Sequence, residues 1–370
     1  RGLVGSEMCI RDRPHPLHQL GPALQAQAQP LLAVMKGLTE SLWPIRYKPF
    51  PDELLTSWLV RLAWGHGLKV QTFCNQVFGG RHQVWNRDVD RLAPDWLVNE
   101  LVVRTGTPWS VAYGTTLRAY EGTLFPKFRA SGALPWIQTL KMYHRQRQGF
   151  GLQFCPACLA EDEKPYYRRS WRVSFNTMCT RHRVMLQDRC PQCESPIMFH
   201  RMEMGQGSVV EVAAMDCCHA CGFALSESPR QAIWGYDEDA HGFHVDLCRA
   251  ITEQDAQSLN PDVMRVLHHL VHLMLSRYPT VNLREHLCGE LGVKDLVEVS
   301  GRVHLETMPL AQRHHLVQLA AWLMGDLQER MGVAWRARAL RYNHMEKDFE
   351  DPPDWYRDVV GRFRNWRMRL

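Results

Sequence analysis

Two stretches decide the expected fold of this chain: FCPACLAEDEKPYYRRSWRVSFNTMCTRHRVMLQDRCPQC at residues 154–193 and DCCHAC at residues 216–221. Together they hold three C-x2-C pairs and one C-x2-H pair: Cys155/Cys158, Cys179/His182, Cys190/Cys193 and Cys218/Cys221. A two-residue spacer lets a tight turn direct two side chains at one ion, and zinc takes four thiolate or imidazole donors in a tetrahedron. Sequential pairing predicts two structural zinc ions per chain, because four protein donors leave no position for a reacting water.

Disulfides are the main alternative for these cysteines. They require an oxidising compartment, and the sequence shows no secretory signal, so we expect a cytoplasmic protein with reduced thiols. Cys217 stands beside Cys218 and is an alternative ligand, although the two-residue spacer favours Cys218. Cys74, Cys248 and Cys288 lie in apolar, helical contexts that favour inert core thiols.

Composition sets wide bounds on the remaining chain. The 370 residues are 45% hydrophobic and 22% charged, which is typical of globular proteins with two or three cores. No apolar run is long enough for a membrane span. A formal net charge of +5 permits a nucleic-acid partner but does not demand one. Composition therefore excludes a membrane-spanning protein without selecting a function.

Residues 1–40 are expected to lie outside the fold. The opening RGLVGSEMCIRDR resembles a translated sequencing adapter, and residues 14–34 are rich in Pro, Gln and Ala without a sustained period. Met35 is a candidate for the true start. We therefore exclude this tail, including Cys9, from functional reasoning.

Residues 45–122 are predicted to form a helical domain. The stretch PDELLTSWLVRLAWGHG has apolar residues at three- and four-residue steps, and a second such stretch ends at Gly79-Gly80. Two further helices are predicted over 94–104 and 109–120. Residues 123–150 contain Gly and Pro breaks and are predicted to be a linker.

The first two helices, over roughly Asp52–Gly79, are joined by a turn that contains glycine. This arrangement is compatible with a helix-turn-helix unit. An ordinary helical hairpin fits at least as well, because the second helix offers few groups to DNA: Lys69, Gln71, Asn75 and Gln76. The pattern leaves both interpretations open.

The metal module, residues 151–225, carries a basic aromatic insert, KPYYRRSWR at 164–172. Its side chains could stack on bases and neutralise phosphates. The nucleic-acid contacts predicted on this basis are Lys164, Tyr167, Arg168, Arg169 and Arg172. Alternatively, the aromatic residues form a small core around the first zinc, while the arginines pair with Glu161 and Asp162.

Residues 226–370 are predicted to form a second helical domain. Asn260-Pro261 provides a helix start for DVMRVLHHLVHLMLSR, in which His268 and His272 share a face that we expect to be solvated. Further helices are predicted over 310–330, 333–348 and 354–370. The last is rich in arginine, and Arg362, Arg364 and Arg367 could contact nucleic acid or an acidic partner, or complement the helix dipole. The expected fold class is therefore mainly α, with an N-terminal helical domain, a central double zinc-finger module and a C-terminal helical domain.

Several motifs resemble the TniQ family, which is related to TnsD and acts in transposition. They are PIRYKPFPDELLTSWLVRLA, VWNRDVDRLAPDWLV with TLRAYEG, FCPACLAED with PYYRRSWR and CTRHRVMLQDRCPQC, and ARALRYNHMEKDFEDPPDWYRDVV. They occur in the expected order from about Pro44 to Arg364. The resemblance implies that the eight paired Cys and His residues ligate zinc and that a helix-turn-helix falls on roughly Asp52–Gly79.

The resemblance also implies an adaptor that selects the target site in DNA recombination by a transposon. Family members recognise target DNA directly or dock on an RNA-guided CRISPR effector complex, and they recruit an AAA+ ATPase regulator of the TnsC or TniB type. We expect the same partners here, with a homodimer as a further assembly and no membrane partner.

Enzymatic functions find little support in the sequence. It contains no P-C-x-x-C of the zinc deaminases, no GxxxxGK[ST] loop and no HExxH, so we expect no catalytic residues. Three interpretations remain: an adaptor that acts through protein contacts, a direct reader of duplex DNA, and a zinc-stabilised transcription regulator. The modest net charge favours the adaptor.

Overall fold

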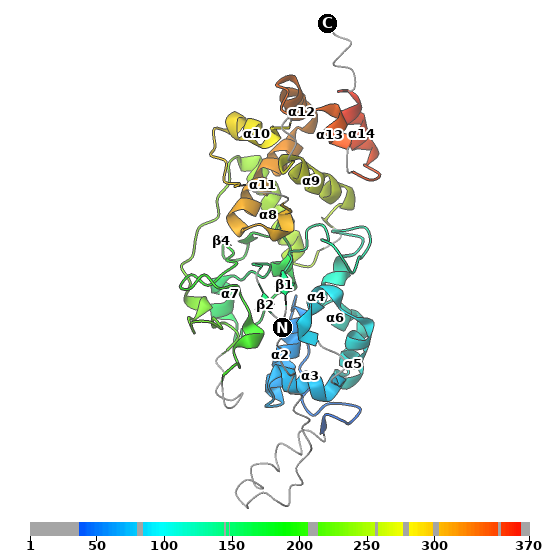
Figure 1. Ribbon diagram of the computed structural model, residues 1–370, viewed down its shortest axis with the longest axis vertical. Coiled ribbons are helices and arrows are strands. Elements are labelled where there is room, and N and C mark those ends of the chain that lie inside the picture. The colour runs from blue at the N-terminus through cyan, green and yellow to red at the C-terminus, as the bar shows by residue number, and fades with distance from the viewer. Residues whose placement is uncertain are drawn as a thin grey trace, which may run out of the picture.

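The computed structural model is an elongated molecule made of three groups of elements (Figure 1). It describes residues 37–79, 84–143, 146–147, 149–205, 214–255, 258–276, 281–298, 303–346 and 349–363, and the side chains of 142–148 are not described. The C-terminal helices lie at one end, and the N-terminal helices lie toward the other end with the cysteine-rich segment beside them. Most of the predicted tail, residues 1–36, lies outside the described residues.

Helix α2 is the centre of the N-terminal group. All of Leu55–Ala63 is buried, because neighbouring helices cover the apolar stripe and the cysteine-rich segment covers the rest. A turn with Gly67 at φ +69° leads to the next helix. The helices of this group are α2 (Leu55–Gly65), α3 (Val70–Phe78), α4 (Val89–Leu92), α5 (Asp95–Thr105) and α6 (Trp109–Tyr113). The helix predicted over 109–120 is thus shorter, and a 3-10 turn follows at Leu117–Tyr120.

The middle group has little regular structure. Its elements are the antiparallel hairpin of β1 (Met142–Tyr143) and β2 (Gln146–Arg147), helix α7 (Pro156–Glu161), a 3-10 turn (Arg169–Arg172), and a second hairpin of β3 (Met178–Cys179) and β4 (Val184–Met185). In the second hairpin, Met178 pairs with Met185 and Cys179 pairs with Val184. Such short elements gain little stability from their own hydrogen bonds, so this group depends on packing and on its cysteine clusters.

The stretch predicted as a linker is part of the packed structure. Leu134, Trp136 and Ile137 are buried, and the Trp136 indole donates a hydrogen bond to the carbonyl of Met264 in the C-terminal group. Pro126 and Gly132 are exposed, but the apolar residues beside these breaks enter the core, which composition alone does not distinguish from an exposed connection.

The C-terminal group is built around α11. Its helices are α8 (Glu238–Thr252), α9 (Pro261–Met274), α10 (Leu283–Leu291), α11 (Leu310–Gly325), α12 (Leu327–Arg336), α13 (Tyr342–Glu346) and α14 (Asp354–Gly361). Helix α11 packs against α8, α9, α10 and α12. The Asn260 side chain caps α9 by accepting the amides of Asp262 and Val263, as its sequence predicts.

Three details of this group differ from the sequence predictions. The helix predicted over 310–330 breaks at Asp326, where φ is −145° and the carboxylate caps α12. The helix predicted over 333–348 is the end of α12 followed by the short α13. His268 is not simply solvated, because its Nε2 lies 2.8 Å from an oxygen of the buried Glu306.

The fold class is mainly helical, as expected. Among the described residues, no helix is long and apolar enough to cross a membrane.

Candidate metal centres

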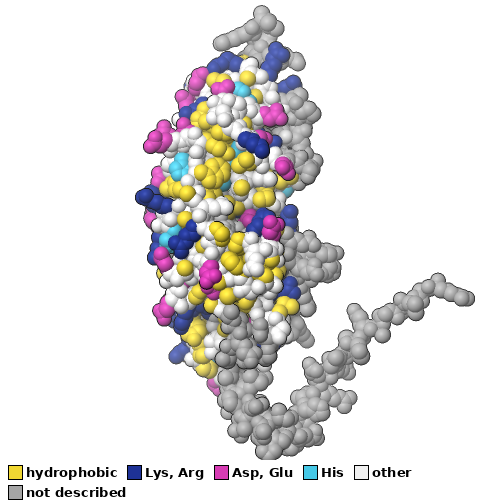
Figure 2. Space-filling view, turned by 90° about the vertical axis from the view of Figure 1, so that its left-hand side faces the viewer, with side chains coloured by type: hydrophobic (Ala, Val, Ile, Leu, Met, Phe, Trp, Pro, Cys, Tyr) yellow, Lys and Arg dark blue, Asp and Glu magenta, His cyan; other side chains and the backbone are white. Residues whose placement is uncertain are grey.

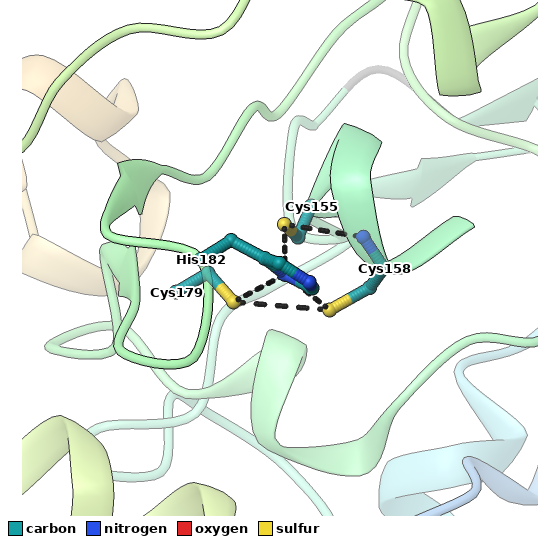
Figure 3. A group of neighbouring side chains, drawn as sticks. All are labelled: Cys155, Cys158, Cys179 and His182. Carbon is teal, nitrogen blue, oxygen red and sulfur yellow. Dashed lines mark hydrogen bonds between the residues drawn. The ribbon is translucent and has the colours of Figure 1, made fainter. Parts of the chain in front are cut away.

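The first cluster is formed by Cys155, Cys158, Cys179 and His182, which converge from two neighbouring elements (Figure 3). Cys155 caps α7, and Pro156 starts this helix, so that Cys158 follows in its first turn. The other two ligands come from the end of β3 and from the turn before β4. Arg183 in that turn has a φ of +54°, which lets the chain reverse within a few residues.

The distances between the donor atoms of the first cluster fit one zinc ion. His182 Nδ1 lies 3.5 Å from Cys155 Sγ, 3.3 Å from Cys158 Sγ and 3.4 Å from Cys179 Sγ. The Cys158 and Cys179 sulfurs are 3.7 Å apart. Zinc bond lengths of about 2.3 Å to sulfur and about 2.0 Å to nitrogen imply tetrahedral edges of roughly 3.5 to 3.8 Å. The donor set and its spacing could therefore hold zinc.

Glu161 is placed to orient the imidazole of the first cluster. Its Oε1 lies 3.0 Å from His182 Nε2, on the opposite side of the ring from the sulfurs. A proton on the nitrogen that faces this carboxylate corresponds to the tautomer that leaves Nδ1 free to bind a metal. The same contact lowers the pKa of the Glu161 carboxyl.

The thiols of the first cluster have to lose protons before they can bind a metal. Hydrogen bonding with Cys155 and Cys179, together with burial, raises the pKa of the Cys158 thiol. Neighbouring thiolates in an apolar setting repel one another, so a cation is needed to stabilise them together. A divalent ion at the centre would supply that charge, which agrees with the chemistry of the donor set.

The second cluster is formed by Cys190, Cys193, Cys218 and Cys221. The sulfurs of Cys190 and Cys221 are 3.6 Å apart, as are those of Cys193 and Cys218, so this set could hold zinc as well. The Cys217 sulfur lies 3.9 Å from an oxygen of Asp216 and outside the cluster. The geometry therefore favours Cys218 over Cys217 as the metal-binding partner of Cys221, in agreement with the two-residue spacer.

The basic aromatic insert is buried, so the predicted nucleic-acid contacts of most of its residues do not hold in this structure. Tyr167 and Arg172 are 0% exposed, and Arg168 and Arg169 are 8% and 7% exposed. The arginines pair with carboxylates: Arg168 with Asp162, Arg169 with Asp52, and Arg172 with both Asp88 and Asp90. The alternative interpretation, a core with internal ion pairs, describes the insert better, and only Lys164 is exposed.

The carboxylates that pair with the insert come from far away in the sequence. The separations, such as 84 residues between Asp88 and Arg172, follow no motif. The insert also pairs with the start of α2 through its backbone, since the amide of Leu54 donates to the carbonyl of Tyr167 at 2.8 Å. The loop of the first cluster therefore joins the cysteine-rich segment to the N-terminal helices.

The other predicted contact residues are only partly described. Arg362 is exposed just after α14, whereas Arg364 and Arg367 lie outside the described residues. In the pair α2–α3, Gln71, Asn75 and Gln76 are exposed on α3. The Glu203 carboxylate accepts the amide of Val70 at 2.9 Å and occupies the N-terminus of α3. The pair remains compatible with both a helix-turn-helix and a hairpin.

A third cluster was not predicted from the sequence. Cys288, Asp295 and His315 bring a sulfur, a carboxylate oxygen and an imidazole nitrogen within 4.8 Å of one another. Cys288 therefore has polar neighbours, although its sequence context favours an inert core thiol. The residues lie in α10, in the loop after it and in α11, and such spacing matches no motif.

Comparison with known proteins gives one family. Residues 44–186 match the TniQ family model, and this range includes the whole first cluster and the basic insert. The second and third clusters and the C-terminal helices lie beyond the match, so the resemblance there stays a prediction. No curated protein matches the chain significantly. Residues 44–186 of the chain are therefore similar to the TniQ family.

Proposed function

We propose that this protein is a target-selection adaptor in transposition, which links a target complex to an AAA+ ATPase regulator of the TnsC or TniB type. The TniQ family is associated with the selection of transposition targets. The match over residues 44–186 is the single observation that carries the proposal. The target complex is either DNA itself or an RNA-guided CRISPR effector complex.

The donor sets support a scaffold. The first and second clusters each offer four protein donors, and a zinc ion held by four protein donors has no position for a reacting water. Thiolate ligands also agree with a reducing compartment such as the cytoplasm. In this proposal the two zinc ions hold the recruiting surfaces in place.

The charges on one face of the molecule favour recruitment through protein contacts there. On the face shown in Figure 2, basic and acidic side chains are interspersed and hydrophobic side chains gather along the middle. A DNA-binding face would instead carry positive charge in a patch or stripe. The buried arginines of the insert are already paired with carboxylates.

Exposed apolar side chains near α5 and α6 offer a surface for a protein partner. Val103 is 57% exposed, Trp109 is 50% exposed and Val111 is 46% exposed. Large apolar and aromatic side chains are common at the centres of protein interfaces. They give the adaptor a surface that can be tested by mutation.

A pull-down with the full chain tests the adaptor. The bait is tagged protein, co-expressed with the other proteins of its transposon operon, with and without guide RNA. We expect capture of the AAA+ regulator, weakened at least tenfold by Trp109→Asp and unchanged by Trp355→Asp, a matched aromatic that is 38% exposed elsewhere. Failure to capture the regulator under either condition would overturn the proposal.

Direct reading of DNA is the second candidate function. It is favoured by the exposed amides of Gln71, Asn75 and Gln76 on α3, because Gln and Asn side chains can pair with adenine in the major groove. The acidic Glu203 at the N-terminus of α3 opposes it, since that end of a recognition helix faces the bases.

DNA binding measured over a range of salt concentrations separates the two functions. A direct reader loses affinity steeply with salt, keeps a site preference, and loses that preference when Gln71 and Asn75 are changed to Ala. The adaptor shows weak binding without preference, and the double variant matches the control Gln328→Ala, which changes an exposed glutamine on α12. A zinc-stabilised transcription regulator would bind DNA but would not capture the ATPase.

A further inference from the structure

The third cluster joins three parts of the C-terminal group. Cys288 lies in α10, which ends at Gly292 with a φ of +64°, and this turn brings Asp295 back toward the helix. His315 lies in α11 and is 0% exposed, while Cys288 is 6% exposed. The cluster is therefore enclosed, except on the side of Asp295, whose side chain is 27% exposed.

The distances within the third cluster are those of donors around an ion. His315 Nε2 lies 3.7 Å from Cys288 Sγ and 3.4 Å from Asp295 Oδ1. A direct N–H···O hydrogen bond is typically about 2.9–3.0 Å long, so the contact between His315 Nε2 and Asp295 Oδ1 is long for a hydrogen bond, whereas the contact with the Cys288 sulfur falls within the range of a weak one. Zinc bond lengths imply tetrahedral edges of about 3.6 Å between sulfur and nitrogen and about 3.3 Å between nitrogen and oxygen.

The imidazole is held in the orientation that a metal ligand requires. His315 Nδ1 lies 2.6 Å from the hydroxyl of Tyr236, which can accept the proton of this nitrogen. Nε2 is then unprotonated and faces both Cys288 and Asp295. A Cys–His–Asp relay for nucleophilic catalysis would need the carboxylate on the opposite ring nitrogen from the thiol. Here both face the same nitrogen, which favours convergence on an ion.

The carboxylate retains capacity for a metal despite its other bonds. Asp295 Oδ2 accepts from Arg284 Nε at 2.7 Å, and Oδ1 accepts from the Val297 amide at 2.9 Å. A carboxylate has about four lone-pair sites, so Oδ1 can still bind one ion. Arg284 also donates to the Met274 carbonyl and so positions the carboxylate toward the cluster.

We propose that Cys288, Asp295 and His315 form a third metal site, which binds a divalent ion of the zinc type through one thiolate, one carboxylate and one imidazole. Three protein donors leave one coordination position for water or another exchangeable ligand, so this ion is held less tightly than four-donor ions. The bound ion connects α10 and the loop that follows it to α11. The site lies outside the family match and does not depend on the proposed function.

Metal analysis of the full-length protein tests the third site. Protein supplied with zinc and dialysed should hold three zinc ions per chain, one for each cluster. Cys288→Ser and Asp295→Asn should each hold one fewer. The control Cys74→Ser removes another buried thiol that belongs to no cluster and should keep all of them. Circular dichroism establishes that each variant is folded. Asp295→Asn changes a partly exposed side chain to one of nearly equal volume, so it covers the case in which Cys288→Ser does not fold.

Cobalt gives a second readout. A mild chelator first removes the ion from the three-donor site, and Co²⁺ is then added. We expect a thiolate-to-cobalt absorption band in the wild type and in Cys74→Ser, and its loss in Cys288→Ser. A wild type with only two zinc ions and no new cobalt band, or a Cys288→Ser protein with unchanged zinc content, would overturn the proposal.

Discussion

The first and second clusters have the same number of donors but very different surroundings. In the first, the three cysteines are buried and the loop between the ligand pairs bonds to the N-terminal helices. In the second, Cys193 and Cys221 are exposed. A metal site stabilises the structure that its ligands hold together. The first cluster should therefore determine the stability of the whole middle of the molecule, and the second that of its own loops.

Removing a ligand of the first cluster should have the largest effect. Cys158→Ser leaves three donors and a buried hydroxyl, and structural zinc contributes on the order of 10–16 kcal/mol of apparent binding free energy. We expect the variant to lose its cooperative thermal unfolding transition, measured by circular dichroism. The control is Cys74→Ser, a buried thiol outside the clusters. A normal transition in Cys158→Ser with one zinc ion lost would show that the first cluster is not needed for the fold.

The buried arginine of the insert should come next. Arg172 is 0% exposed and pairs with Asp88 at 2.5 Å and with Asp90 at 3.3 Å. Burial raises the pKa of Asp90 to about 6 although Arg172 lowers it, so removal of the guanidinium leaves a poorly solvated carboxylate. Arg172→Leu should lower the free energy of unfolding by about 3–5 kcal/mol, measured by urea denaturation.

The matched control for this ion pair lies at the surface. Arg336 pairs with Glu329 and is 58% exposed, so Arg336→Leu should cost at most about 1 kcal/mol. Equal effects of the two substitutions would mean that the insert does not fix the first cluster to the N-terminal helices.

The sequence predicts the clusters better than their surroundings, for a physical reason. Zinc ligands form a local pattern, because a two-residue spacer is needed to bring two donors to one ion, and so all eight residues could be named in advance. The burial of Tyr167 and Arg172 depends on Asp88 and on α2, which are distant in the chain. The third cluster is of this second kind: Cys288 and His315 are 27 residues apart and meet only because α10 packs on α11.

A lower pH should weaken the contact between the first cluster and the C-terminal helices. The expected loss of stability is smaller than that caused by Arg172→Leu. The loop of the first cluster is bound to α8 by His244, whose Nε2 donates to the Phe175 carbonyl at 2.7 Å while Nδ1 accepts from Gln318. Burial lowers the pKa of His244 to about 4. The unfolded chain binds this proton below about pH 6.5, so stability falls as the pH drops from there toward 4.

This linkage predicts a loss from His244 of about 2 kcal/mol between pH 6.5 and pH 5, at about 1.4 kcal/mol per pH unit. Urea denaturation at both values, for the wild type and for His244→Gln, measures it. Zinc release in acid affects both proteins alike, so the difference between them isolates the histidine. Identical pH dependence in the two proteins would mean that His244 is not held neutral in the folded state.

Removing an exposed donor of the second cluster should have the smallest effect on global stability, although it takes away one of the four donors that could hold a zinc ion. Cys221→Ser leaves Cys190 and Cys218 buried and frees only the loops around residues 190–194 and 216–222. We expect an unfolding midpoint close to that of the wild type and faster proteolysis within these loops. Cys217→Ser is the neighbouring control, since that thiol lies outside the cluster. Cys221→Ser could instead unfold the molecule as completely as Cys158→Ser. The exposure of its cysteines would then not predict how much of the structure a cluster stabilises.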